Sequence, residues 1–347
     1  MLSVWVTSFS NAALTPTAIA LGNFDGLHLG HRQVVLPILQ RAGIPDSLTA
    51  SPEGSKDGAI YGTVVTFRPH PQEFFSGQPK KLLTPLREKV ALLRSMGVDQ
   101  LVLLPFNREL AALTPDEFVA KILVRQLQAH RISVGCDFHF GARRAGTAND
   151  LAAIAANYGI DVTVVPLYTD SGERISSSAI RTFLQNGDLQ QANKFLGRPY
   201  SLSGVVVQGQ QLGRKIGFPT ANLQLPPEKF LPRFGVYAVR IAIEPNTGEE
   251  FSHTGTFNLR PETINPMPKN VYPPILGVMN IGCRPTVAGE NPTVEVHLFD
   301  WTEDLYGKIL TANLEHFLRP EQKFPSLEAL KEQIHNDCVF ARNLMMG

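Results

Sequence analysis

The sequence predicts a two-domain α/β protein, in which an open parallel sheet precedes an antiparallel barrel or compact sheet with a terminal helix. At 347 residues the chain is long enough for two domains of ordinary size. Up to about residue 186, short apolar runs alternate with helical patterns, which is typical of right-handed βαβ units. Beyond that point short strands dominate. We therefore predict domains at 1–186 and 187–347.

The first domain alternates buried strands with amphipathic helices. Two helix starts carry their own signals, because Thr84 precedes a proline and Thr114 can form a capping box with Glu117. The Ser-, Gly- and Pro-rich segment 46–62 is expected to be a surface loop. The expected strands are 17–21, 63–67, 100–105, 132–135 and 161–165, and the expected helices are 29–42, 84–96, 114–127, 150–158 and 178–186.

The second domain is expected to consist mainly of short strands. Alternation of apolar and polar residues is clearest at Thr293–Phe299. A segment at 252–274 that contains several Pro and Asn residues is expected on the surface. The final helix is predicted to begin after Ser326 as its cap. The expected strands are 204–208, 235–243, 276–281, 293–299 and 308–317, and the apolar stripe of the final helix is Leu327, Leu330, Ile334 and Cys338.

Composition and charge exclude several classes of protein. A net charge of +1 argues against a nucleic-acid partner, and the chain has no apolar run long enough to span a membrane. Its three cysteines are widely spaced and fit neither a disulfide framework nor a zinc motif. No Lys or Arg precedes the first apolar residues, so we expect no signal peptide and a reducing cytoplasm.

The segment Gly22–Arg32, which follows the first strand, is a candidate phosphate site. His28 and His31 lie three residues apart near a helix start, where unpaired N–H groups favour anions. Gly30 between them would admit a bulky group. The alternative is that the two histidines are only a solvated helix face or a cap, because glycine-rich turns after strands are weakly specific.

Other strand-end segments can converge on the same cleft, since ligands of open parallel sheets bind at the carboxyl ends of strands. These are Phe67–Pro71 and Asp137–Gly146. A hydroxyl cluster at Ser176–Ser178, bracketed by Arg174 and Arg181, offers N–H groups, hydroxyls and cations to a triphosphate. An ordinary serine cap with surface arginines explains this cluster equally well.

The second domain contains a second candidate site. Spaced glycines with Arg214 and Lys215 can lay backbone amides over phosphates, although the segment is not a Walker P-loop. Thr220 and Asn222 point the same way in an extended segment and offer neutral oxygen ligands to Mg²⁺. Glu295 could accept a proton from an alcohol that attacks a γ-phosphoryl group. Taken singly, each residue also fits an ordinary turn or strand. The glycines are Gly204, Gly209, Gly213 and Gly217.

Taken together, these motifs resemble the bifunctional prokaryotic riboflavin kinase/FMN adenylyltransferase (FAD synthetase) family over nearly the whole chain. In the first domain the matching stretches are G-N-F-D-G-L-H-L-G-H-R, T-F-x-P-H-P, G-x-D-F-x-F-G and I-S-S-S-x-I-R, which begin at Gly22, Thr66, Gly135 and Ile175. In the second they are G-R-x-x-G-F-P-T-A-N, G-V-Y, N-I-G-x-R-P-T and V-E-V-H-L-F-D, which begin at Gly213, Gly235, Asn280 and Val294.

The resemblance implies a Rossmann-like nucleotidyltransferase domain and a riboflavin kinase barrel. It implies that His28 and His31 hold ATP phosphates, that Glu295 is a general base, that Thr220 and Asn222 hold Mg-ATP, and that Arg319 lies near the flavin. Ser178 replaces a usual Thr, Arg68 replaces a usual Asp, and Ala142–Thr147 is looser than the common form. The remaining nucleotide-binding residues that it implies are Gly22, Phe24, Asp25, Gly26, Asp137, Ser176, Ser177, Ser178, Arg181, Gly213, Arg214 and Gly217.

The function expected from this resemblance is a pair of ATP-dependent reactions, in which riboflavin gives FMN and FMN gives FAD with release of pyrophosphate. The expected cofactor is Mg²⁺, the partners are small molecules, and a homo-oligomer is compatible with the sequence. Three alternatives remain: a chain with only the kinase active, a nucleotide- or flavin-binding regulatory protein, and an RNA-binding relative of the aminoacyl-tRNA synthetases. The near-zero net charge counts against the last.

Overall fold

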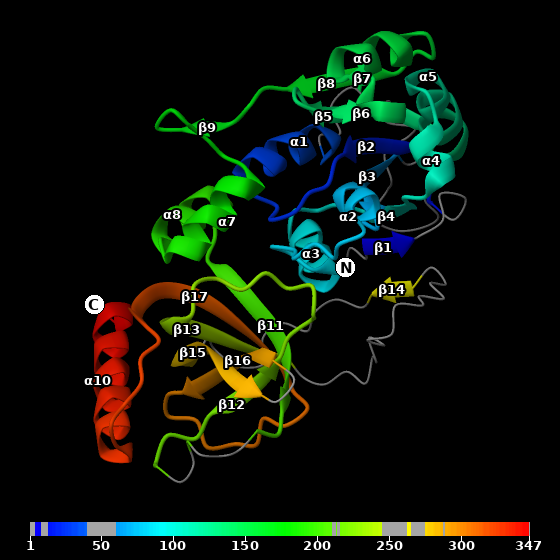
Figure 1. Cartoon of the computed structure of the whole chain (residues 1–347). Helices are drawn as coiled ribbons and strands as arrows, with labels where there is room; N and C mark the ends of the chain where they lie inside the picture. The colour runs from blue at the N-terminus through cyan, green and yellow to red at the C-terminus, as the bar shows by residue number, and fades with distance from the viewer. Residues whose placement is uncertain are drawn as a thin grey trace. The chain divides into compact units, whose positions relative to one another are not determined.

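The structure, a computed structural model, consists of two compact units (Figure 1). Unit 1 comprises Met1–Ser176 with Thr254–Pro266, and unit 2 comprises Ser177–His253 with Met267–Gly347. Helix α7 (Ser177–Asn186) therefore belongs to unit 2, where it packs on α8 (Leu189–Leu196). The described residues are 4–7, 13–39, 60–209, 213, 216–244, 262–264, 275–286 and 289–346.

Within the described residues, unit 1 is built on a seven-stranded sheet in the order β14-β1-β4-β3-β2-β5-β8. All neighbours are parallel except β14, which pairs antiparallel with β1. This confirms the predicted open parallel sheet. The strands are β1 (Val4–Thr7), β2 (Thr17–Leu21), β3 (Tyr61–Arg68), β4 (Gln100–Pro105), β5 (Ala129–Gly135), β8 (Asp161–Val165) and β14 (Glu262–Ile264), with short hairpins β6 (His139–Phe140) to β7 (Gly146–Thr147) and β9 (Thr169–Asp170) to β10 (Glu173–Arg174).

Helices cover both faces of this sheet, so its central strands are buried throughout. Along β2, Ala18 and Ala20 pack toward α1 and α3, whereas Ile19 and Leu21 pack toward η3 and α6. The helices of unit 1 are α1 (Leu29–Leu39), α2 (Pro71–Ser76), α3 (Leu86–Ser95), α4 (Arg108–Ala112), α5 (Pro115–Phe118), the π-helix η3 (Val119–Gln126), the 3₁₀ turn η4 (Ala142–Arg144) and α6 (Ala148–Ala156).

Several local predictions are tested directly. The capping box is confirmed, because Thr114 accepts from the Glu117 N–H while Glu117 accepts from the Thr114 N–H. The predicted cap at Thr84 is wrong, since α3 starts after Pro85 with no side-chain cap. His70, to which the sequence assigns no role, caps the short helix α2. The expected surface segments 46–62 and 252–274 lie mostly outside the described residues, but Tyr61 and Gly62 already belong to β3.

The order of the strands defines where a ligand can bind. From β2 the chain passes to β3 on one side, and it later returns to β5 on the other. The crevice at the carboxyl ends of β2 and β5 is therefore the topological switch point, where ligands of open α/β sheets bind. The turn Gly22–Arg32 follows β2, and Asp137 follows β5 closely, so the sequence places polar groups at this point.

Within the described residues, unit 2 contains a closed antiparallel barrel in the order β11-β12-β16-β15-β13-β17, which confirms the predicted barrel. Tyr237, Val239 and Ile241 of β13 are fully buried inside it, while Val236 and Ala238 pack outward in the cluster that contains residues of α10. The strands are β11 (Tyr200–Val207), β12 (Ala221–Gln224), β13 (Gly235–Glu244), β15 (Ile275–Thr286), β16 (Gly289–Leu298) and β17 (Ile309–Pro320).

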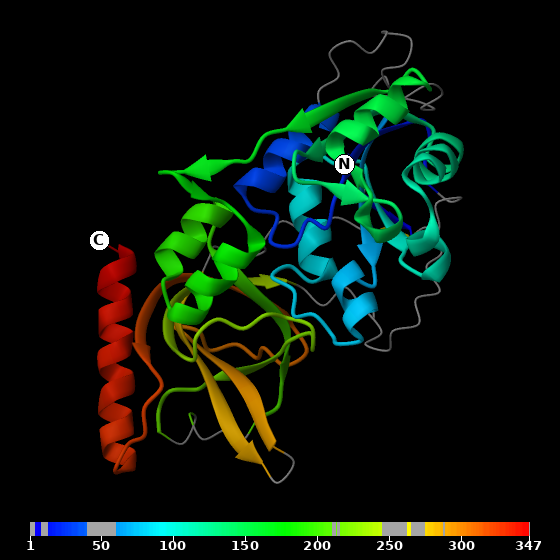
Figure 2. The same ribbon diagram turned by 45° about the horizontal axis from the view of Figure 1, so that its top comes forward.

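The terminal helix α10 (Leu327–Met346) runs alongside the barrel (Figure 2). Its cap is confirmed, because Ser326 Oγ accepts from the Ala329 N–H at 3.1 Å. Of the predicted stripe, Ile334 and Cys338 pack on the barrel, but Leu327 is exposed, since the contact begins further along the helix. None of the three cysteines forms a disulfide in this structure.

Candidate active sites

The turn after β2 adopts a strained backbone that the surrounding elements hold in place. Phe24 and Leu27 have positive φ angles of 48° and 43°, although both side chains are buried. The Gly22 N–H donates to Val65 O, and Thr66 Oγ1 donates to Asn23 O, so β3 fixes the start of the turn. A conformation held this firmly is preorganised for a ligand.

Residues before α3 fix the middle of the same turn. The Gly26 N–H donates to Thr84 Oγ1 at 2.7 Å, and the Thr84 N–H donates to Asp25 Oδ1 at 3.2 Å. Nearby, the buried Lys89 donates to Asn23 O at 3.0 Å; its burial lowers the pKa of the ammonium, and the charge of Asp25 opposes that shift. Asp25 and Gly26 thus stabilise the conformation of the turn through their hydrogen bonds to Thr84, and the Asp25 side chain is buried.

His28 and His31 are brought together as predicted. Their rings stack with centroids 3.6 Å apart, and the buried Phe24 ring lies 5.4 Å from His31. The His31 N–H donates to His28 Nδ1 at 3.2 Å, so a neutral His28 carries its proton on Nε2 and can donate it to an anion. A Cβ on Gly30 would lie 3.2 Å from the His28 ring. Gly30 therefore makes room for His28, a role the sequence did not indicate.

The end of β5 carries a second polar group of unit 1. Asp137 forms an ion pair with Arg174 of the hairpin β9–β10, and both side chains are about half exposed. This joins the predicted Asp137 to one of the two arginines that bracket the serine cluster. Within unit 2, Arg181 Nη1 donates to Ser177 O at 3.2 Å, and its guanidinium lies 5.7 Å from the Phe230 ring. Ser177 and Ser178 open helix α7, directly after Ser176.

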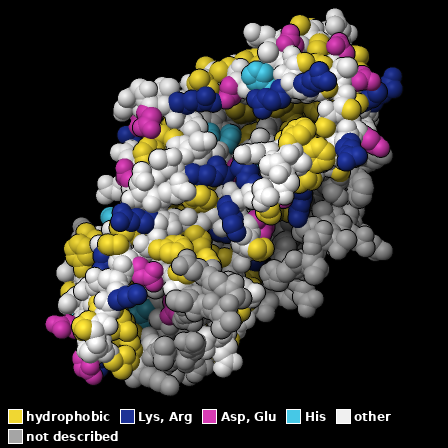
Figure 3. Space-filling model, viewed as in Figure 1, with side chains coloured by type: hydrophobic (Ala, Val, Ile, Leu, Met, Phe, Trp, Pro, Cys, Tyr) yellow, Lys and Arg dark blue, Asp and Glu magenta, His cyan; other side chains and the backbone are white. Residues whose placement is uncertain are grey.

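An aromatic cluster at the carboxyl ends of β3 and β4 was not predicted. It consists of Phe67, Phe74, Phe75 and Phe106, whose rings contact edge to face at centroid distances of 5.3–5.8 Å. Among the exposed large apolar side chains of the described residues, Phe75 has the largest exposed fraction, 72%. The only sequence signal was the presence of phenylalanines near T-F-x-P-H-P. On the face shown in Figure 3, Lys and Arg side chains with hydrophobic groups between them are prominent over unit 1.

The barrel brings the predicted kinase residues together. Thr220 Oγ1 lies 3.4 Å from Glu295 Oε2, and Asn222 of β12 is directly opposite Glu295 of β16. Directly opposed residues of neighbouring strands share a face of the sheet. A Cβ on Gly209 would overlap the Asn222 amide, and one on Gly213 would lie 3.1 Å from Thr220 Oγ1. Glycine at these positions leaves the two side chains their space.

The glycine-rich segment before Thr220 forms a tight turn. The Phe218 N–H donates to Gly213 O at 2.8 Å, and Gly217 has a φ of 90°, which favours glycine. His297 contacts Pro219 O through Nδ1 at 2.8 Å and so ties β16 to the end of this turn. Arg214 lies outside the described residues.

Asn280 is a neighbour of this site that sequence reasoning missed. It lies on β15 directly opposite Glu295, on the side away from Asn222. Glu295 is thus flanked by an asparagine on each neighbouring strand. The sequence did contain a signal for Asn280, because this residue begins the motif N-I-G-x-R-P-T. Only the pairing of the strands shows that Asn280 lies opposite Glu295.

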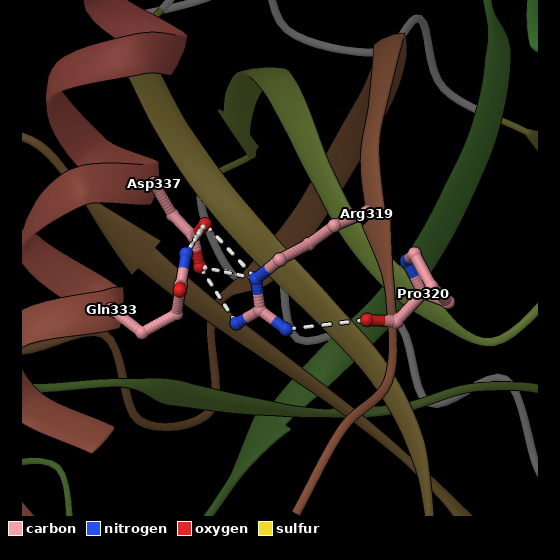
Figure 4. Close-up of polar contacts among 4 residues, drawn as sticks. All are labelled: Arg319, Pro320, Gln333 and Asp337. Carbon is pink, nitrogen blue, oxygen red and sulfur yellow. Dashed lines mark hydrogen bonds and ion pairs between the residues drawn. The ribbon is translucent and has the colours of Figure 1, made fainter. Parts of the chain in front are cut away.

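Arg319, predicted to lie near the flavin, pairs with a carboxylate of the terminal helix in this structure. Its guanidinium pairs with Asp337 of α10, with Nη2 2.8 Å from Oδ2 (Figure 4). Both carboxylate oxygens of Asp337 also accept from Arg319 Nε at 3.0 Å. The side chain therefore joins β17 to the terminal helix.

Two negative findings apply to the described residues. These residues contain no group of three or more His, Cys, Asp and Glu side chains that could hold a metal ion. Mg²⁺ bound mainly by substrate phosphates does not need such a group. No helix within the same ranges is long and apolar enough to cross a membrane.

Comparisons with known proteins match both halves. A family model described as FAD synthetase matches residues 10–179, and one described as riboflavin kinase matches residues 196–345. The bifunctional riboflavin kinase/FMN adenylyltransferase of Escherichia coli K12 is 38% identical over 97% of this chain and 95% of that protein. The Haemophilus influenzae enzyme of the same name is 36% identical over 96% of each chain, and that of Bacillus subtilis is 34% identical over 92% and 90%.

One solved structure matches the fold over the whole chain. It is described as a macrolide-efflux protein from Streptococcus pneumoniae, has a TM-score of 0.75 and 28% identity, and the match covers 99% of both chains. The likeness supports the order of an open sheet followed by a barrel within one chain.

Proposed function

Because the chain belongs to the family of bifunctional riboflavin kinase/FMN adenylyltransferases, we propose that it catalyses both reactions in separate halves. Residues 187–347 phosphorylate riboflavin with ATP, and residues 1–186 adenylylate the FMN that results. The observation that carries the proposal is the convergence of two independent residue sets: the stacked His28 and His31 in one unit, and Thr220, Asn222 and Glu295 in the other.

Adenylyl transfer requires no covalent enzyme intermediate. A phosphate oxygen of FMN attacks the α-phosphorus of ATP, the new P–O bond forms the pyrophosphate bridge of FAD, and the bond to the leaving pyrophosphate breaks. His28 Nε2–H and the His31 ring donate to the phosphates and neutralise the charge on the leaving group. Arg174, now paired with Asp137, is a further cation within reach of the β5 end. Ser176, Ser177, Ser178 and Arg181 remain predicted nucleotide contacts.

The flavin ring of FMN is assigned to the aromatic cluster Phe67, Phe74, Phe75 and Phe106. Flat aromatic rings gain both burial and favourable edge or stacked contacts from such a surface. The exposed Phe75 supports this assignment, because a bound ring would cover it. We expect Phe75→Ala to raise the KM for FMN in adenylyl transfer and to leave riboflavin phosphorylation unchanged.

In the kinase half, Glu295 accepts the proton of the terminal ribityl hydroxyl as its oxygen attacks the γ-phosphorus, and ADP leaves. The residues present fit Mg²⁺, because Thr220 and Asn222 supply neutral oxygens in space that Gly209 and Gly213 leave open. When bound with ATP, the ion would neutralise phosphate charge. Catalysis by the chain itself then consists of positioning the hydroxyl and removing its proton.

The test is incubation with riboflavin, ATP and Mg²⁺, with products separated over time. FMN followed by FAD supports both activities, FMN alone supports only the kinase, and neither product indicates a binding protein. Glu295→Ala should abolish FMN formation but leave FAD formation from supplied FMN. The double variant His28→Ala, His31→Ala should do the reverse. Loss of both activities in either folded variant would refute separate sites.

The remaining expectations are part of the same proposal. The substrates and products are riboflavin, FMN, FAD and ATP, and Mg²⁺ is the metal. A cytoplasmic location is supported by the bacterial relatives, since these substrates are intracellular metabolites. Association into homo-oligomers is open to measurement by light scattering.

A further inference from the structure

Arg319, Gln333 and Asp337 form a polar cluster, here called the Arg319 node, between β17 and α10 (Figure 4). Besides the two-point contact with Arg319, Asp337 Oδ1 accepts from Gln333 Nε2 at 2.9 Å. The side chains of Arg319 and Asp337 are only 18% and 8% exposed. Asp337 is thus buried and Arg319 partly buried, and both carboxylate oxygens accept hydrogen bonds. This is the arrangement that makes an ion pair away from water tolerable.

A β-bulge in β17 aims Arg319 at the helix. Phe317 is opposite Tyr237, but the next pair is Arg319 with Val236, so Leu318 is an extra residue. Regular alternation would turn Arg319 to the same face as Phe317, whereas the bulge places it with the outward-facing Val236. Leu318 and Val236 both pack in the cluster that contains Cys338 of α10. The bulge therefore directs two successive side chains toward α10.

The node also contacts residues 321–325, here called the strap, which connect β17 to α10: the Arg319 guanidinium lies over the Phe324 ring, 5.6 Å from its centroid. Arg319 Nη1 donates to Pro320 O at 3.2 Å, immediately before the strap. Glu321 of the strap lies over Gly282 of β15, because a Cβ at Gly282 would overlap its Oε1. The same point is 3.3 Å from Asn280 Nδ2. The Glu321 carboxylate and the Asn280 amide are therefore neighbours.

Asn280 lies between the strap and the proposed base. On β15 it is directly opposite Glu295 of β16, whereas Asn222 of β12 is opposite Glu295 on the other side. If Thr220 and Asn222 take the metal and the ATP phosphates, the alcohol that Glu295 deprotonates must approach from the other side. The strap borders that side.

We propose that Asp337 is a positioning residue for the kinase reaction: through Arg319 it holds the strap with Glu321 beside Asn280, and so sets how tightly the flavin acceptor binds. The proposal rests on the proposed kinase function and deepens it. It replaces the expectation that Arg319 contacts the flavin with an indirect role. Because the node lies on the acceptor side, it should affect riboflavin and not ATP.

The test is steady-state kinetics of the full chain carrying Asp337→Asn. We expect the KM for riboflavin to rise about tenfold, as for loss of one charge-assisted contact, while kcat and the KM for ATP change less than about twofold. FAD formation from supplied FMN should be unchanged. A fall in kcat at constant KM, or no change in the KM for riboflavin, would overturn the proposal.

Arg342→Gln is the matched control. Arg342 also joins α10 to the barrel, through two contacts of 2.9 Å to Asp300, but this pair does not adjoin the strap. We expect this variant to keep the KM for riboflavin. An equal rise in both variants would show that any loosening of α10 has the same effect, and would overturn the specific role of Asp337.

A milder variant covers the case in which Asp337→Asn does not fold, since breaking a buried ion pair is strongly destabilising. Gln333→Met removes only the amide donor to Asp337 and should raise the KM for riboflavin about threefold. An unchanged KM in a folded Gln333→Met chain, with no folded Asp337→Asn chain to compare, would overturn the proposal. The unmodified chain is measured first. If it does not phosphorylate riboflavin, the proposed function fails; if it does, the variants test the role of Asp337 alone.

Discussion

At the residue scale, the histidine turn depends on close contacts that the sequence pattern does not reveal. The H-x-G-H spacing correctly predicted that His28 and His31 lie together. It did not predict the reason for the glycine between them, which is the His28 ring itself. Nor could it predict the Phe67, Phe74, Phe75 and Phe106 cluster, because those contacts join segments that fold together only in three dimensions.

Gly30→Ala tests the packing of this turn. The new Cβ would lie 3.2 Å from the His28 Cε1 atom and 3.3 Å from Nδ1, so the imidazole must move by a few tenths of an ångström. We expect kcat/KM for adenylyl transfer to fall about tenfold, or ~1.4 kcal/mol. Riboflavin phosphorylation, measured in the same preparation, serves as the control. An unaltered adenylyl transfer rate would mean that the position of the His28 ring is not critical.

The cysteines give a prediction about pH. Burial, aided by the charge of Asp337, raises the pKa of the Cys338 thiol to about 11. A raised pKa keeps the group protonated at neutral pH, and only the thiolate reacts. Alkylation followed by mass spectrometry should label the exposed Cys136 rapidly and Cys338 slowly, with the Cys338 rate increasing as the pH approaches 11. Equal rates near neutral pH would contradict the burial of this face of α10.

At the element scale, the periodicity of apolar residues predicted most elements of both units. It located β2, β4 and β8 with their observed bounds. β2 and β4 are buried, short and mostly apolar, as interior strands of a parallel sheet are, whereas β8 is a partly exposed edge strand. It missed α2, α4 and β12, which are too brief to show a period. It also missed α8, although the buried residues of this helix, Leu189, Ala192, Phe195 and Leu196, recur at helical spacing. It also predicted the wrong role for Thr84. The Thr84 hydroxyl accepts a hydrogen bond from the Gly26 N–H in the turn after β2 and does not cap α3.

Thr84→Val tests this coupling between α3 and the histidine turn. Loss of the hydroxyl leaves the buried Gly26 N–H without its acceptor at 2.7 Å, which should destabilise unit 1 by about 1–3 kcal/mol. The loosened turn should also raise the KM for ATP in adenylyl transfer. Thr84→Ser keeps the oxygen and is the control. If the valine and serine variants unfold at the same temperature, the hydrogen bond contributes little.

At the scale of the whole molecule, the division into two units predicts two unfolding events. Each unit has its own buried core, one around the parallel sheet and one in and around the barrel. Calorimetry of the full chain should therefore show two transitions. Saturating riboflavin should raise the midpoint temperature of one transition by about 5 °C and leave that of the other unchanged, because only one half uses riboflavin as a substrate. A single transition that shifts as a whole would show that the units unfold together.

Strand β14 has a consequence for any attempt to divide the chain. Its residues, Glu262–Ile264, come from between two barrel strands, yet they complete the sheet of unit 1 by pairing with β1. A fragment that stops at residue 186 would lose this partner and expose the hydrogen-bonding groups of β1, which invites self-association. A fragment without the barrel would therefore have to keep residues 262–264 and join them to the rest of unit 1. Point substitutions that inactivate one half leave the sheet complete.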